Sequence, residues 1–147
     1  MEFVLRSARV VLAPRTILHM SYYFSRMLAT SFDEAIERTT AALQQQGFGV
    51  ISDIDVAATM RAKLGVDFRN YRILGACNPA LAYEALQLED KIGLMLPCNV
   101  IVQEKGAAGI EVAAIDPVAS MAAIDNPNLK RAAEVVRSKL RAAIERI

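Results

Sequence analysis

The sequence predicts an α+β domain in which helices cover a largely antiparallel sheet. Three observations support this class: apolar residues recur at helical spacing in some segments, they alternate or form short runs in others, and Gly or Pro separates the segments. The predicted order is β, α, β, a short α, β, α, β, β, α, which suits helices layered on a sheet. A chain of 147 residues has the common size of a single domain.

A strand and a helix form the first predicted unit. Apolar side chains alternate with polar ones over residues 22–28, which indicates a strand. Ser31 and Glu34 form a capping box, in which the serine oxygen accepts a backbone N–H and the glutamate reaches back. The helix that begins there ends at Gly47.

The second unit pairs a strand with a short helix. The stretch GFGVISDID predicts a strand through Val50, Ile51 and Ile54, and the helix that follows runs from Asp55 to Leu64, closed by Gly65. The third predicted strand, residues 71–76, runs directly into Cys77.

Asn78 and Pro79 mark the start of the next helix. Asparagine suits an N-cap and proline suits the first helical position, so a helix is expected over residues 79–88. A buried strand centred on Val100 and Val102 comes next.

The C-terminal part contains a hairpin and the most regular helix. The run IGLMLPCNVIVQE predicts this buried strand, with Pro97 marking its start or an edge. A loop at residues 105–109 connects it to a strand at 110–115. A connector of small residues is expected at 118–125. The final helix begins at Asn126, and its apolar stripe comprises Leu129, Ala133, Val136, Leu140, Ala143 and Ile147.

Composition excludes several classes of function. Lys plus Arg number 17 against 16 Asp plus Glu, so the chain has no global positive field for nucleic acid or an anionic membrane. No run reaches the roughly 18 apolar residues that a membrane-spanning helix needs. The only histidine, His19, cannot build a site of several imidazoles. We therefore expect a cytoplasmic protein without nucleic-acid or membrane partners.

Residues 1–19 differ from the rest of the chain. They carry three Arg and one Glu and lack the apolar core of a secretory signal. They suggest either an organelle-type transit segment or an extension created by a start site upstream of Met20, the second being favoured. The single α+β domain is then expected over residues 20–147.

Two Cys-Asn steps are the main chemical signal. Cys77-Asn78 and Cys98-Asn99 each lie at a strand boundary. Cys77 precedes a helix N-terminus, where the macrodipole favours a thiolate, so it is a candidate nucleophile. The alternative is that both cysteines are small buried hydrophobes. The two thiols can meet only if their strands are antiparallel neighbours.

Other candidates are weaker. Asp55 and Lys63 could add a carboxylate and an ammonium group to a polar site, although helix capping and solvation explain them equally. The basic residues of the final helix could contact phosphate, but cations near a helix C-terminus are favoured in any case. No GxGxxG motif or Walker A loop is present.

The stretches YRILGACNPALAYEAL and IGLMLPCNVIVQE, together with SFDEAIERTTAALQQQGFGVISDIDV and AKLG, resemble the bacterial and archaeal domain-of-unknown-function 302 family. The resemblance extends from about Tyr22 to the final helix. It implies a TATA-binding-protein-like fold and a tendency to form homodimers, but no established activity. It also implies antiparallel strands, which would place Cys77 and Cys98 near the same sheet edge.

Three functional hypotheses follow. The leading one is a homodimeric module that binds a small ligand or a metal through Cys77, Asn78, Cys98 and Asn99, with Asp55 and Lys63 as weaker candidates and without catalytic residues. The second is a thiol redox or sulfur-transfer protein, in which Cys77 is the nucleophile and Cys98 resolves it. The third is a purely structural oligomerisation domain. The sequence identifies no cofactor.

Overall fold

A five-stranded sheet forms the centre of the protein, seen in a computed structural model that describes residues 21–147. The strands are ordered β1-β5-β4-β3-β2, and each neighbouring pair is antiparallel. Their bounds are β1 Tyr23–Leu28, β2 Gly49–Asp55, β3 Tyr71–Cys77, β4 Cys98–Glu104 and β5 Ile110–Ile115. The predicted α+β class with an antiparallel sheet is confirmed.

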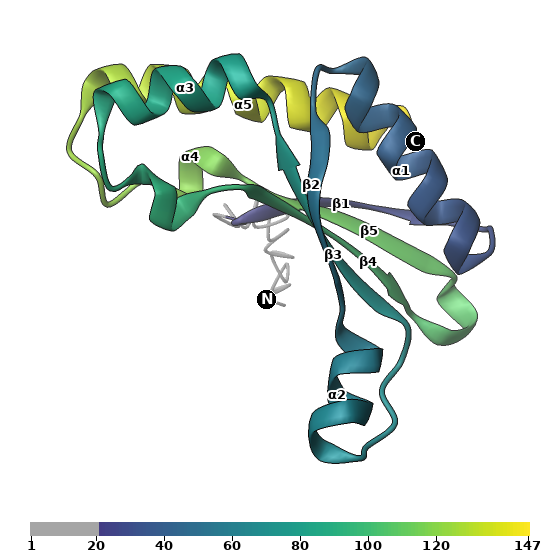
Figure 1. The fold of residues 1–147 in the computed structure, drawn as a ribbon. Helices are drawn as coiled ribbons and strands as arrows, with labels where there is room; N and C mark the ends of the chain where they lie inside the picture. Colours follow the sequence, from purple (N-terminus) through teal and green to yellow (C-terminus); the bar gives the residue numbers. More distant parts are fainter. Residues whose placement is uncertain (1–20) are drawn as a thin grey trace, which may run out of the picture.

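The main helices lie on one side of this sheet (Figure 1). Helix α1 packs on β2, β4 and β5, and α5 packs on β1 and β5. Helix α3 packs beside α5, and α2 projects away from the rest (Figure 1). Their bounds are α1 Phe32–Gln45, α2 Val56–Leu64, α3 Pro79–Leu88, α4 Pro117–Ser120 and α5 Pro127–Glu145, with 3-10 turns η1 Ile92–Met95 and η2 Gly106–Ala108.

Two hydrophobic clusters hold these layers together. The larger cluster lies between α1, α5 and the sheet, and includes the buried Val100 and Val102 of β4. The smaller cluster joins α3, η1 and the segment after α4 to the first half of α5, and includes Ile92 and Leu129. Helix α5 contributes to both because its apolar stripe is continuous over five turns.

The structure corrects two details of the sequence analysis. The expected connector at residues 118–125 begins with a helix, α4, because the Asp116 carboxylate accepts a hydrogen bond from the Val118 N–H at 2.9 Å and Pro117 takes the first helical position. Residues 92–95, which belong to the apolar run before the buried strand, form a 3-10 turn. Periodicity cannot separate a short buried turn from a short strand.

Two further predictions concern the extension at the N-terminus and the lack of a membrane-spanning helix. The proposed extension at residues 1–19 lies outside the described residues. Over residues 21–147, no helix has both the length and the apolar character needed to cross a membrane.

Candidate functional site

The junction of β3 and α3 presents the first Cys-Asn step. The Asn78 side-chain oxygen accepts a hydrogen bond from the Leu81 N–H at 3.3 Å, and Pro79 follows at the start of the helix. This is the predicted cap, and it fixes the end of β3 against the first turn of α3. Cys77, directly before the cap, is half-buried and carries a free thiol.

The start of β4 presents the second step. Ala76 pairs with Cys98 in the antiparallel β3–β4 register, so both cysteines lie at the same edge of the sheet. This is the arrangement that the family resemblance implied. Cys98 is also a free thiol, and its side chain faces the buried layer because its partner Ala76 does.

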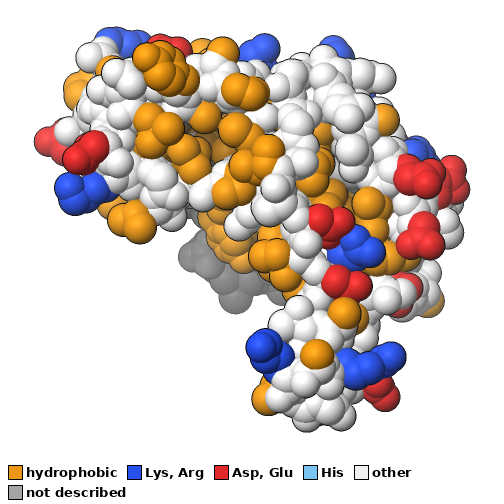
Figure 2. All heavy atoms as spheres, in the orientation of Figure 1, with side chains coloured by type: hydrophobic (Ala, Val, Ile, Leu, Met, Phe, Trp, Pro, Cys, Tyr) orange, Lys and Arg blue, Asp and Glu red, His pale blue; other side chains and the backbone are white. Residues whose placement is uncertain are grey.

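A cavity of about 370 Å³ lies where the two hydrophobic clusters meet, and both thiols line it. Figure 2 shows hydrophobic side chains gathered in this region, below α3 and beside β3. As far as residues 21–147 form it, the wall is apolar apart from Cys77, Asn78 and Cys98. Its other members are Phe48, Ile51, Ala76, Leu81, Ala82, Ala85, Leu86, Gly93, Leu96, Pro97, Met121, Leu129, Ala132, Ala133 and Val136.

The two thiols have different environments inside this cavity. Only 5% of Cys98 is exposed, whereas Cys77 is half-buried. Burial, with a smaller contribution from the neighbouring Cys77, raises the pKa of the Cys98 thiol from 9.0 to about 11. Cys98 therefore stays protonated at neutral pH, and Cys77 is the accessible thiol.

Asn99 lies away from this cavity. Cys98 faces the helices, so the next residue of β4 points to the opposite face of the sheet. There Asn99 is exposed and lines a second hollow of about 430 Å³, together with Tyr23 and Ile115. The two members of the Cys98-Asn99 step thus belong to different surfaces.

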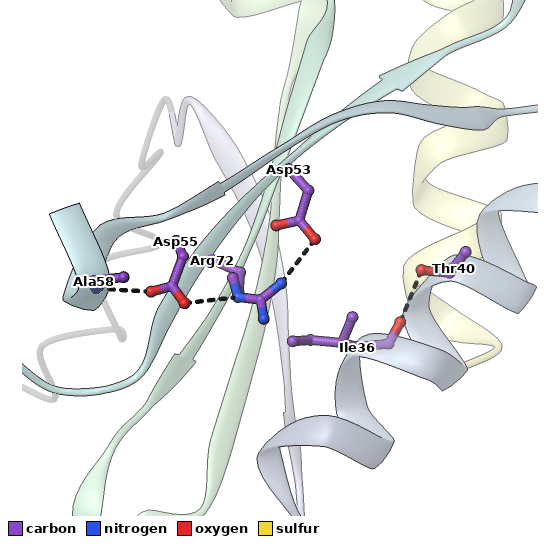
Figure 3. A network of polar contacts seen from close by, with 6 residues as sticks. All are labelled: Ile36, Thr40, Asp53, Asp55, Ala58 and Arg72. Carbon is purple, nitrogen blue, oxygen red and sulfur yellow. Dashed lines mark hydrogen bonds and ion pairs between the residues drawn. The ribbon is translucent and has the colours of Figure 1, made fainter.

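Asp55 and Lys63 also lie away from the thiols. The Asp55 carboxylate accepts a hydrogen bond from the Ala58 N–H at 2.9 Å, which caps α2, and lies 3.6 Å from the Nε atom of Arg72. Arg72 also contacts Asp53 at 2.7 Å (Figure 3). Lys63 is exposed on the projecting α2. Asp53, Asp55 and Arg72 form a charged group that is separate from the two thiols.

Sequence reasoning missed the part of the cavity wall that later elements provide. Met121 follows α4, and Ala132 and Val136 belong to α5. Helical spacing placed Val136 on the core stripe of the final helix, but a stripe does not reveal which of its residues line a cavity. The sequence feature that could have indicated the cavity is the short side chains Ala82 and Ala132, because they leave space between the facing helices α3 and α5.

Metal ligands do not gather around the thiols. Within residues 21–147, no three or more His, Cys, Asp or Glu side chains lie close enough together to hold a metal ion. A structural zinc site usually takes four such ligands. The two thiols alone supply fewer ligands than such a site takes.

The fold and site define an antiparallel α+β domain with a thiol-bearing apolar cavity at one edge of its sheet. The chain belongs to the family described as Domain of unknown function DUF302, which matches residues 24–147. The crystal structure of an uncharacterized conserved DUF302 protein from Bacillus stearothermophilus is similar to it, with a TM-score of 0.79 and 28% sequence identity. The match covers 85% of this chain and 97% of that chain. No curated protein matches the chain.

Proposed function

We propose that this domain binds a small apolar ligand in the cavity between its two hydrophobic clusters. The observation that carries the proposal is the cavity itself, which is lined by apolar side chains and contains both cysteines and Asn78. Pockets of roughly 300–1,000 Å³ with apolar walls and a few polar groups are typical of small-molecule sites. At about 370 Å³, this cavity lies within that range.

The polar groups of the wall limit the kind of ligand. Among residues 21–147, no Asp, Glu, Lys, Arg or His lines the cavity, so a charged ligand would lose its hydration without gaining a partner from these residues. The Asn78 oxygen is used in the helix cap, which leaves the two N–H donors of its amide nitrogen for a polar group of the ligand. An uncharged, largely hydrocarbon molecule with one polar group fits best.

The apolar fluorophore 1-aminoanthracene provides a direct test. Its fluorescence should increase and saturate on titration with the protein. The variant Ala132→Phe, which adds a ring to the cavity wall, should weaken binding by about tenfold or more, equal to about 1.4 kcal/mol. Ala82→Leu offers a milder substitution on the opposite helix, and circular dichroism verifies that each variant is folded.

Ala41→Phe is the matched control, because Ala41 is an exposed residue of α1 outside the cavity wall. It should bind the fluorophore like the unmodified protein. Non-saturable fluorescence, or equal binding by the cavity and control variants, would contradict the proposal.

Thiol exchange is the second candidate function, and the shared sheet edge of Cys77 and Cys98 favours it. In this proposal Cys77 attacks and Cys98 resolves. The raised pKa of Cys98 weighs against it, because a thiol that stays protonated is a slow resolving group. A disulfide mass shift after mild oxidation, absent from Cys98→Ser, would support exchange.

We also propose that the domain acts as a homodimer, through the face of the sheet opposite the helices. A row of apolar side chains crosses that face through successive cross-strand pairs, comprising Ile54, Ile73, Ile101 and Ala113. Exposed Tyr23 and Met27 of β1 flank the row. A formal net charge of +1 leaves little repulsion between two copies.

A further inference from the structure

We propose that Cys77 captures α,β-unsaturated carbonyl compounds covalently, with the hydrocarbon part of the compound held in the cavity. This inference rests on the proposed ligand-binding function and adds the chemical class of the ligand. It uses a combination that an ordinary hydrophobic core does not need, namely an accessible thiol in the wall of an apolar space.

The first step of the argument is the division of roles between the two thiols. Both line the cavity, but only Cys77 is partly exposed. Cys98 stays protonated at neutral pH because burial raises its pKa to about 11. Reaction is therefore expected at Cys77, whose sulfur a reagent can reach, and not at the buried Cys98.

The second step is the buried thiol itself. Cys98 is 5% exposed and lines the cavity, and no hydrogen bond joins its S–H to another of the described residues. A thiol is only a weak donor, so a hydrophobic core tolerates it without a hydrogen bond. A ligand carbonyl or other acceptor in the cavity would give this weak donor a partner.

The third step is the chemistry, which needs no second substrate. Cys77 Sγ, having lost its proton to water, forms a bond with the β-carbon of the ligand. The π electrons of the C=C bond move toward the carbonyl group, and the α-carbon then takes a proton from water. One C–S bond forms and one C=C π bond is lost, with no leaving group and no external oxidant or reductant.

The size of the cavity sets the size of the ligand. A cavity of about 150 Å³ holds one benzene molecule. The present cavity, at about 370 Å³, has room for roughly two and a half times that, or about fifteen carbon atoms. Capture should therefore become faster as the hydrocarbon part of the reagent grows toward that size.

A series of N-alkylmaleimides tests this expectation, since each carries the same unsaturated carbonyl group and a different hydrocarbon tail. Intact-mass spectrometry measures the rate of addition at neutral pH, and peptide mapping locates the adduct. Each rate is divided by that of the same reagent with glutathione. The corrected rate for N-hexylmaleimide should exceed that for N-methylmaleimide by at least about tenfold.

The variants define the outcomes. Cys98→Ser should keep the chain-length effect, Cys77→Ser should form no adduct, and Ala132→Phe should lose the effect while still reacting with N-methylmaleimide. Ala41→Phe should behave like the unmodified protein. Equal corrected rates along the series, or an adduct on Cys98, would overturn the inference.

The saturated compound N-hexylsuccinimide separates failure of capture from failure of binding, because it cannot react with a thiol. If it displaces 1-aminoanthracene from Cys77→Ser while the maleimide rates show no chain-length effect, the cavity binds ligands and only the capture inference fails. If it does not displace the fluorophore, and the fluorophore itself shows no saturable binding that depends on the cavity variants, the proposed function fails as well.

Discussion

At the scale of single residues, the fold changes the ionisation of Cys98 most clearly. The cause is local: its side chain points into the buried layer at the start of β4, beside Cys77. The sequence identified both cysteines and Asn78 as candidates, since each lies at a strand or helix boundary. The sequence could not show which residues share a surface with Cys98. Asn99, the next residue in the chain, faces the other side of the sheet.

The ionisation of Cys98 predicts a loss of stability in alkali. Its pKa is 9.0 in ordinary surroundings and about 11 in the folded protein. Below pH 9 both states keep the proton, and above it the unfolded chain releases a proton that the folded chain retains. The free energy of unfolding should therefore fall by about 1.4 kcal/mol per pH unit, and by about 3 kcal/mol up to pH 11.

Urea unfolding at several pH values between 8 and 11, compared with Cys98→Ala, isolates this effect from other titrating groups. The difference between the two curves should shrink across the interval. Cys77→Ala should retain most of the dependence, because burial is the larger cause of the shift. Parallel curves for the protein and Cys98→Ala would contradict the assignment.

At the scale of elements, β2 and β3 meet tightly at Gly75. A Cβ atom at this position would lie 2.1 Å from Ser52 Oγ and 2.6 Å from Pro97 Cγ. The register of β2 shifts between Val50 and Ser52, so that Ile51 has no partner in β3. This bulge turns Ile51 toward the cavity wall and brings Ser52 over Gly75.

Gly75→Ala should therefore destabilise the protein by about 1–3 kcal/mol, because β2 or Pro97 must move to admit the methyl group. Chemical denaturation gives the change in free energy of unfolding. The matched control is Gly49→Ala in β2, where an added Cβ meets no atom within 4 Å. A loss of stability equal to that of the control would refute the steric explanation.

Helix starts were the most predictable elements. Ser31, Asp55, Asn78 and Asn126 each accept a hydrogen bond from a backbone N–H of the helix that they cap. Such caps depend on neighbouring residues only, which is why the sequence reveals them. Turn η1 and the wall of the cavity depend on contacts between distant segments, and no local pattern encodes those contacts.

At the scale of the whole molecule, α2 is the element least attached to the rest. None of its residues is buried, and residues 61–70 are all exposed. Asp55 and Gly65 define its ends, so its existence was predictable. Its projection from the body was not, because capping signals say nothing about what a helix packs against. A helix this short gains little stability from its own hydrogen bonds.

The proposed homodimer predicts the effect of charges on the face opposite the helices. Sedimentation velocity should give twice the mass of one chain. Ile54→Lys should lower the association constant of the dimer by about tenfold, because the lysine would interrupt the apolar row. Leu94→Lys on η1 is the control: Leu94 is 85% exposed but lies outside that row. A monomer at every concentration would refute the dimer.

The meeting place of the two hydrophobic clusters also affects how the chain unfolds. Helix α5 belongs to both clusters. Away from this helix, the cavity lies between residues of the larger cluster and residues of the smaller one. We therefore expect the smaller cluster to open as a unit of its own while the sheet stays intact. A bound ligand would touch both clusters and join them into one cooperative unit. Ligand binding should therefore sharpen the unfolding transition as well as raise its midpoint.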